Sequence, residues 1–150
     1  HGNSFYDEVL RVPLIFRLPE KIPSGLRIPF NVSNIDIKPT ILDVLGIDNE
    51  IKFEGKSLMS FFNGNENQNR SVFSEQERGR FSLSLRDDRY KIIFPTVKPD
   101  KLANIDLMYY KKFKDGEFYD IKRDPEEKNN LIIKENEISK KMRKKNRFYF

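Results

Sequence analysis

Apolar and polar residues follow two different repeats along this chain. In the first half, apolar side chains recur at the spacing of one helical face, at Ile37, Ile41, Val44 and Leu45. Asp36 is a typical N-cap residue, Pro39 falls in the first turn, and Gly46 is a typical C-cap. The pattern therefore predicts an amphipathic helix between Asp36 and Gly46.

The second half contains short strand-like runs, several of which alternate between apolar and polar residues. These runs are residues 71–75, 80–86, 90–95 and 117–121. Asp87 and Asp88 separate two of the runs, and Asp115 and Gly116 precede the last, as is typical of β-turns. The alternation predicts a small antiparallel sheet, and a helix is predicted to follow it over residues 125–147.

Two further segments suggest how the chain is divided. Residues 11–16, RVPLIF, are typical of a strand, although Pro13 removes one ladder donor and so predicts an edge strand or a strand that begins at the proline. Residues 63–71, NGNENQNRS, contain no apolar side chain and are typical of a linker. We therefore expect one domain over residues 1–62 and another over residues 72–150.

Composition and charge narrow the class of protein. With 37% hydrophobic residues, 13 Phe and 6 Tyr, the chain has enough apolar surface for a core, and no apolar run is long enough to predict a transmembrane segment. Residues 138–150 hold six of the 28 basic residues and no acidic one, which leaves 22 basic against 23 acidic residues elsewhere. A solvated helix end explains this basic tail better than a nucleic-acid surface does, and a tail that binds phosphates or a membrane surface is the alternative.

The residues suited to catalysis are few. His1 is the only histidine, and the chain has no cysteine, which excludes disulfides and thiolate metal sites. A single imidazole cannot form a metal site or a nucleophilic site by itself. We therefore expect the chain to be a piece of a longer protein, cut through an active site.

Four segments resemble the C-terminal part of the sulfatases, within the alkaline-phosphatase-like superfamily, and they occur in the family's order. They are HGNSFYDEVLRVPLIF, VSNIDIKPTILDVLGI with the following EGKSL, VFSEQERGRFSLSLRDDRYKII, and GEFYDIKRDPEEKNNL. The resemblance implies an alkaline-phosphatase-like α/β fold. Residues 1–62 would supply the last strand and a covering helix of the large catalytic domain, and residues 72–150 a small subdomain with an antiparallel sheet and a C-terminal helix.

The same resemblance implies a hydrolase of sulfuric esters. Sulfatases use a formylglycine, made from the first residue of a C/S-x-P-S-R motif, and a calcium ion. This chain has no such motif and no matching metal ligands, so the resemblance implies that both groups lie N-terminal to His1 and that the chain alone is inactive. The implied substrate is a small-molecule or glycan sulfate ester.

His1 is the one residue whose catalytic role the resemblance implies. In many family members a lysine or histidine stands five residues before the tyrosine of the YDE block, and His1 has that spacing to Tyr6. There it would bind the sulfate oxygens and hold or protonate the leaving group. A merely structural polar residue and a metal ligand are the alternatives.

For the other charged residues a structural role is the stronger hypothesis. We expect Asp7 and Glu8 to anchor the loop before the strand, Arg11 to pair with a carboxylate, and Asp36 to cap a helix. Arg86 is expected to form a cross-strand ion pair. Glu127 and Lys128 are expected to be surface charges in the first turn of a helix.

Two rival functions follow from the same sequence. Within the superfamily, a phosphodiesterase, a phosphonate hydrolase or a phosphoglycerol transferase would use a related site for a similar tetrahedral anion, and the upstream nucleophile would distinguish them. The other rival is a non-enzymatic module that binds anions through the basic tail.

Overall fold

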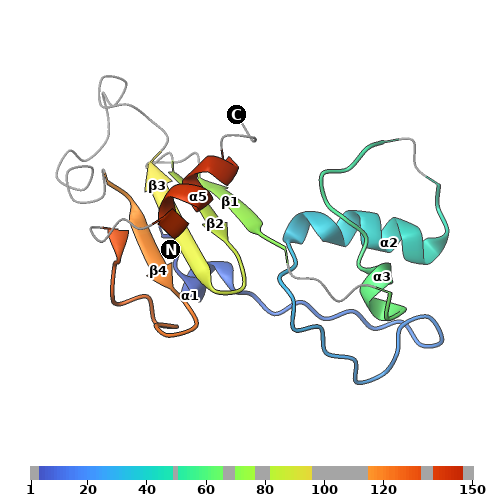
Figure 1. Ribbon diagram of the computed structural model, residues 1–150. Coiled ribbons are helices and arrows are strands. Elements are labelled where there is room, and N and C mark those ends of the chain that lie inside the picture. Colours follow the sequence, from blue (N-terminus) through green and yellow to red (C-terminus); the bar gives the residue numbers. More distant parts are fainter. Residues whose placement is uncertain are drawn as a thin grey trace. The chain divides into compact units, whose positions relative to one another are not determined.

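The structure is a computed structural model of the chain. It describes residues 4–48, 51–65, 70–76, 82–95, 115–132 and 137–146. The chain divides into two compact units, one made of His1–Val12 together with Phe73–Phe150, and the other of Pro13–Val72 (Figure 1). The expected assignment of residues 1–62 and 72–150 to the domains of a larger protein stays a prediction.

A four-stranded sheet forms the first unit. The strands β1 (Val72–Gln76), β2 (Ser82–Arg86), β3 (Tyr90–Pro95) and β4 (Glu117–Asp120) lie side by side in chain order. The β2–β3 and β3–β4 pairs are antiparallel, as the alternation predicted.

The predicted turns at the two aspartates are also present. The Asp87 carboxylate accepts the backbone N–H groups of Arg89 and Tyr90 at 2.9 and 2.7 Å, which closes the turn between β2 and β3. Before β4, Gly116 has φ +81°, and a Cβ there would lie 2.6 Å from the carbonyl oxygen of Ile93. Only glycine fits this position without strain.

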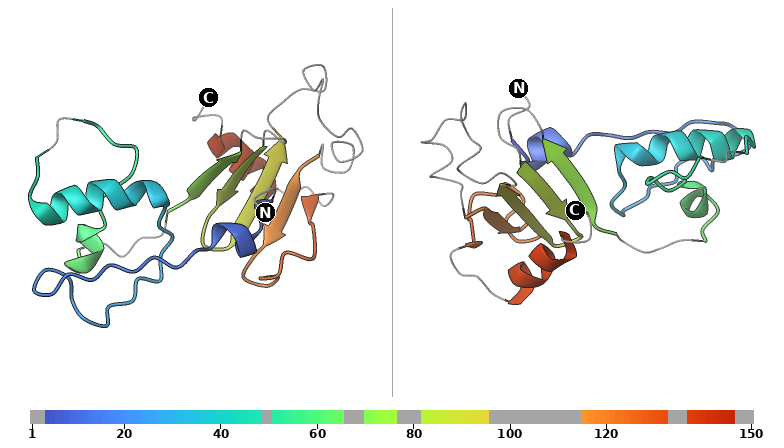
Figure 2. Two further views of the ribbon diagram at one scale, coloured as in Figure 1. Left: turned by 180° about the vertical axis from the view of Figure 1, so that it is seen from behind. Right: turned by 90° about the horizontal axis from the view of Figure 1, so that it is seen from above.

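The two faces of the sheet carry separate apolar clusters, because successive strand residues point to opposite faces. One face packs against α5 (Glu137–Asn146) through Leu85, Ile92, Phe118, Ile132 and Met142. The other packs against the segment around α1 (Asp7–Leu10) through Phe5, Ile93, Tyr119 and Ile121. Figure 2 shows α1 and α5 on opposite faces of the sheet.

The predicted helix over residues 125–147 is wrong in its first part. Residues 121–126 form turns, and the helix that the structure describes begins at Glu137. Asp124 accepts the backbone N–H groups of Lys128 and Asn129, and the Asn130 side chain accepts those of Phe118 and Ile132. The N–H groups of Lys128, Asn129 and Ile132 are ones that a helix over this segment would use itself, and the bond to Phe118 holds the segment to β4 instead.

The second unit is built around the predicted helix. This helix, α2 (Ile37–Leu45), follows the short 3₁₀ helix η1 (Asn34–Asp36) and ends at Gly46, whose φ is +68°. A second short helix, α3 (Met59–Phe62), contributes to a core of Leu58, Phe61 and Phe62. No helix among the described residues combines the length and the apolar character that crossing a membrane requires.

The predicted strand at residues 11–16 is absent. This stretch has no ladder bonds, Leu14 and Phe16 pack against the core of the second unit, and Val12 and Ile15 are exposed, Ile15 by 87%. Its alternation is that of a strand with one buried face, but a strand also needs a neighbour. The described part of the chain supplies none at this place.

Asp36 has the structural role that was expected, with one correction. Its fully buried carboxylate accepts the backbone N–H groups of Ser33 and Lys56 at 2.7 and 2.9 Å and forms an ion pair with Arg70. The bond to Ser33 belongs to a capping box that begins η1, whereas α2 itself receives no side-chain cap.

Candidate functional site

The candidate site is described through the segment that follows His1 in the sequence. His1 itself lies outside the described residues, and its expected role in catalysis and substrate binding stays a prediction. Residues 4–10 are described, and they lie against the sheet of the first unit. The contacts of this segment therefore define what the structure contributes to the site.

Tyr6 is tied to the sheet through a carboxylate. Its hydroxyl donates to Glu117 Oε2 at 2.8 Å, and the hydroxyl of Tyr119 donates to the same oxygen at 2.5 Å. The two tyrosine rings meet edge to face, with centroids 6.2 Å apart. Burial and the hydrogen bond to Glu117 raise the pKa of Tyr119 well above its usual value, so its hydroxyl stays a donor.

Asp7 is the centre of a second set of contacts, which we call the buried charge cluster and define as Asp7, Arg86, Lys91 and Glu127. Lys91 Nζ lies 2.9 Å from Asp7 Oδ1 and 2.6 Å from Glu127 Oε1. Arg86 Nη1 lies 2.5 Å from both carboxylate oxygens of Asp7. The backbone N–H of Asp7 donates to Glu127 Oε2 at 2.6 Å. The cluster therefore joins α1 to β2, to β3 and to the loop after β4.

The charges of this cluster balance, which is a condition for burying them. Lys91 is fully buried and Glu127 nearly so, and an isolated charge at such a place would cost several kcal/mol. Burial acts to raise the pKa of Asp7, but hydrogen bonds from Lys91 and Arg86, together with their positive charges, outweigh burial and hold the pKa below its ordinary value. Asp7 is therefore a carboxylate engaged in structure.

Comparisons with known proteins identify the family of this chain. Residues 3–148 match the family model described as N-sulphoglucosamine sulphohydrolase, C-terminal. The chain belongs to this sulfatase family. The resemblance found in the sequence is thereby confirmed.

One curated relative and two solved structures are similar to this sulfatase chain. The N-acetylglucosamine-6-O-sulfatase of Bacteroides thetaiotaomicron is 26% identical over 142 residues, which cover 86% of the chain and 22% of that protein. The chain therefore spans about a fifth of the length of this relative.

The solved structures support the expected fold. One is BT4656 in complex with its substrate D-glucosamine-2-N,6-O-disulfate, with a TM-score of 0.55 and 20% identity over 73% of this chain and 22% of that one. The other is Ps i-CgsB, with a TM-score of 0.59 and 17% identity over 87% of this chain and 27% of that one. The fold is that of the C-terminal part of a sulfatase.

The structure confirms some of the expected roles of charged residues and corrects others. Asp7 anchors its segment, as expected, and Glu8 is exposed. Arg86 pairs with Asp7 of α1, so the expected cross-strand pair is wrong. Arg11 is exposed and forms no ion pair with a described carboxylate. Glu127 is not a surface charge, because it is buried against Lys91.

Sequence reasoning missed Lys91, Glu117 and Tyr119. The available signal was the run YKIIFP, in which a lysine stands at a strand position next to apolar neighbours. A lysine inside a strand that is buried on both faces requires a carboxylate partner. The sequence could thus have indicated a buried ion pair, although not with which residues.

The described residues do not fit the formylglycine and the calcium ion that the resemblance leads us to expect. Among them, no three His, Cys, Asp or Glu side chains are grouped so as to hold a metal ion. The carboxylates of the buried charge cluster face a lysine and an arginine instead. The chain also has no C/S-x-P-S-R motif whose first residue could become a formylglycine.

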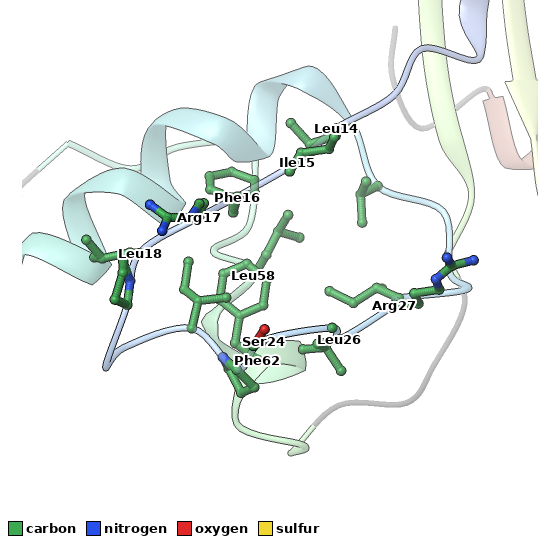
Figure 3. Close-up of a pocket in the computed structure, with 16 residues that line it drawn as sticks. Leu14, Ile15, Phe16, Arg17, Leu18, Ser24, Leu26, Arg27, Leu58 and Phe62 are labelled. Atoms are coloured by element: carbon green, nitrogen blue, oxygen red, sulfur yellow. The ribbon is translucent and has the colours of Figure 1, made fainter.

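The second unit contains a hollow of about 890 Å³, shown in Figure 3. Leu58 and Phe62 line it together with the loop that runs from Leu14 to Ile28. The lining is apolar except for Arg17, Ser24 and Arg27, and it includes no acid or base suited to proton transfer. This hollow has the character of a packing surface.

Proposed function

We propose that this chain is the C-terminal part of a sulfatase whose nucleophile and metal ligands lie outside these 150 residues. The observation that carries the proposal is the family match over residues 3–148, in a chain that spans 22% of its curated relative. The sequence contains no C/S-x-P-S-R motif from which a formylglycine could be made. Formylglycine and calcium, which sulfatases are expected to use, are accordingly assigned to the rest of the protein.

The substrate that we propose is a sulfated glucosamine, free or at the end of a glycan. The family is named for N-sulphoglucosamine, the curated relative for N-acetylglucosamine 6-sulfate hydrolysis, and BT4656 holds a glucosamine disulfate. All three names share an amino sugar that carries sulfate.

His1 is the residue of this chain that we propose to act in catalysis. Cleavage of a sulfate ester places negative charge on the leaving oxygen, and an imidazole can hydrogen-bond to that oxygen or protonate it. The spacing of His1 to Tyr6 supports this role. The role gains further support from the contacts of Tyr6 and Asp7, which fix the segment that follows His1.

We also propose that residues 1–62 contribute an outer strand and a covering helix to the catalytic domain. Support comes from the apolar side chains that this part exposes, among them Val12, Ile15, Ile41 and Leu45. Exposed apolar residues at this density are typical of surfaces that pack against another part of a protein. Leu14 and Phe16 are part-buried and Ile15 between them is exposed, an alternation that a strand in such a sheet would also have.

The experiment uses the full-length protein and measures sulfate released from glucosamine 6-sulfate and from N-sulfoglucosamine, with an aryl phosphate as the competing substrate. We expect sulfate release, and we expect His1→Ala to lower kcat by about 10²–10⁴-fold, the usual contribution of a general acid. Glu8→Ala, an exposed change in the same segment, is the matched control and should leave kcat unchanged. Hydrolysis of the phosphate without any release of sulfate would contradict the proposal.

A further inference from the structure

The segment that carries α1 cannot hold its own position. The helix is a single turn of four residues, none of which is buried. Helices this short are unstable in isolation, because nucleation costs more than one turn of hydrogen bonds returns. Its place on the sheet must therefore come from contacts with the sheet.

Two adjacent residues supply the polar contacts. Tyr6 bonds to Glu117 at the start of β4, and Asp7 bonds to Lys91 near the start of β3. Arg86 at the end of β2 holds the other side of Asp7. Because the two residues are tied to different strands, the segment cannot rotate or slide without breaking both contacts.

Displacement of this segment would be costly. Lys91 is fully buried, and Glu117 is 4% exposed. A shift by one residue would take the Asp7 carboxylate away from Lys91 and the Tyr6 hydroxyl away from Glu117. Buried polar groups that lose their partners pay the full cost of desolvation, so one register is strongly preferred.

We propose that Tyr6 and Asp7 are positioning residues that fix the register of the N-terminal segment on the sheet and thereby hold His1 at the sulfate group. The proposal rests on the proposed function of His1 and adds the contacts that position it, those of Tyr6 and Asp7 with the sheet. His1 precedes Tyr6 by five positions in the sequence, and five residues span at most about 18 Å, so an anchor at Tyr6 limits the region that His1 can reach.

The chain offers a matched pair of variants for the test. Tyr6→Phe and Tyr119→Phe each remove one hydroxyl from the same oxygen of Glu117, and each keeps the aromatic ring. Only Tyr6 belongs to the N-terminal segment. Both variants should therefore lower thermal stability to a similar extent, but only Tyr6→Phe should release the segment.

In the full-length enzyme we expect Tyr6→Phe to lower kcat about 10-fold, because small displacements of reacting groups have effects of this size or larger. Tyr119→Phe should change kcat by less than about 2-fold, which is the size of the deviation expected between sites that act independently. In a His1→Ala background, Tyr6→Phe should have no further effect, since it acts through His1. Equal losses of kcat in the two single variants, or a full additional loss in the double variant, would overturn the proposal.

A second measurement does not depend on activity. Amide hydrogen exchange in peptides that cover residues 4–10 should be faster in Tyr6→Phe than in Tyr119→Phe. Equal exchange in the two variants would overturn the positioning role. If the unsubstituted enzyme releases no sulfate, the proposed function and the role of His1 fail together, and the exchange rates still decide whether Tyr6 holds the segment.

Discussion

Lys91→Met removes the ammonium group on which the buried charge cluster depends and keeps a chain of similar length. In the structure, the fully buried ammonium lies 2.9 Å from Asp7 and 2.6 Å from Glu127. Removing one partner of a buried ion pair costs about 3–5 kcal/mol, because a charge is left uncompensated. Arg86 still contacts Asp7, so we expect a loss near the lower end, about 3 kcal/mol.

The assay is amide hydrogen exchange over β3 in the full-length protein, which reports the free energy of local opening of this unit. The matched control is Lys122→Met, whose ammonium lies 3.2 Å from Asp88 on a side chain that is 60% exposed. Exposed pairs contribute about 0–1 kcal/mol, so this control should change little. If Lys91→Met costs no more than Lys122→Met, the reasoning about the cluster is refuted.

Two further predictions concern the effect of low pH on Asp7 and the substitution of Gly116. The folded state lowers the pKa of Asp7 below its ordinary value of 3.8. The ionised carboxylate therefore makes its full contribution to the stability of the folded state above that pH, and this contribution is lost as the pH falls through the lowered pKa. The protection of the amides of residues 4–10, measured relative to their intrinsic exchange rate at each pH, should therefore fall below about pH 4. Asp7→Asn should flatten this dependence, whereas an unchanged profile in the variant would contradict the assignment. Gly116→Ala should destabilise β4 by about 2–3 kcal/mol, because its positive φ is combined with a Cβ 2.6 Å from the Ile93 carbonyl. Gly25→Ala, with φ +73° and open space around the Cβ, should cost only about 1–2 kcal/mol in its own unit, and equal losses would show that the close approach does not matter.

Local patterns in the sequence were sufficient for some of the regular elements. The strands β1 to β4 and the helix α2 were predicted because alternation, turn residues and a C-cap glycine act over a few residues. The strand at residues 11–16 was predicted from the same kind of pattern, but a strand needs a neighbour that pattern cannot supply. The helix over residues 125–147 was shortened by Asp124 and Asn130, whose side chains compete for the backbone.

The anchor of the candidate site could be predicted only in part. The YDE block indicated that Asp7 holds its segment, and family spacing indicated His1. The partners could not be found, because Asp7 and Lys91 are 84 positions apart, and no local rule pairs residues at that separation. Glu127 was also misjudged. It stands two residues after Pro125 in a charged stretch, which is typical of a surface charge, and its partner Lys91 is distant in the sequence.

The first unit is discontinuous along the chain, and this affects how it is made. The ribosome delivers Asp7 well before Lys91, and at about 5–20 residues per second the interval of 84 residues lasts about 4–17 s. Throughout that interval the residues of β3 and β4 on which Phe5, Tyr6 and Asp7 dock have not been made. Completing this unit therefore has to wait until β3 and β4 have been made, and a gene truncated before the codon for Lys91 would yield a chain in which the segment around Asp7 has no docking site on β3.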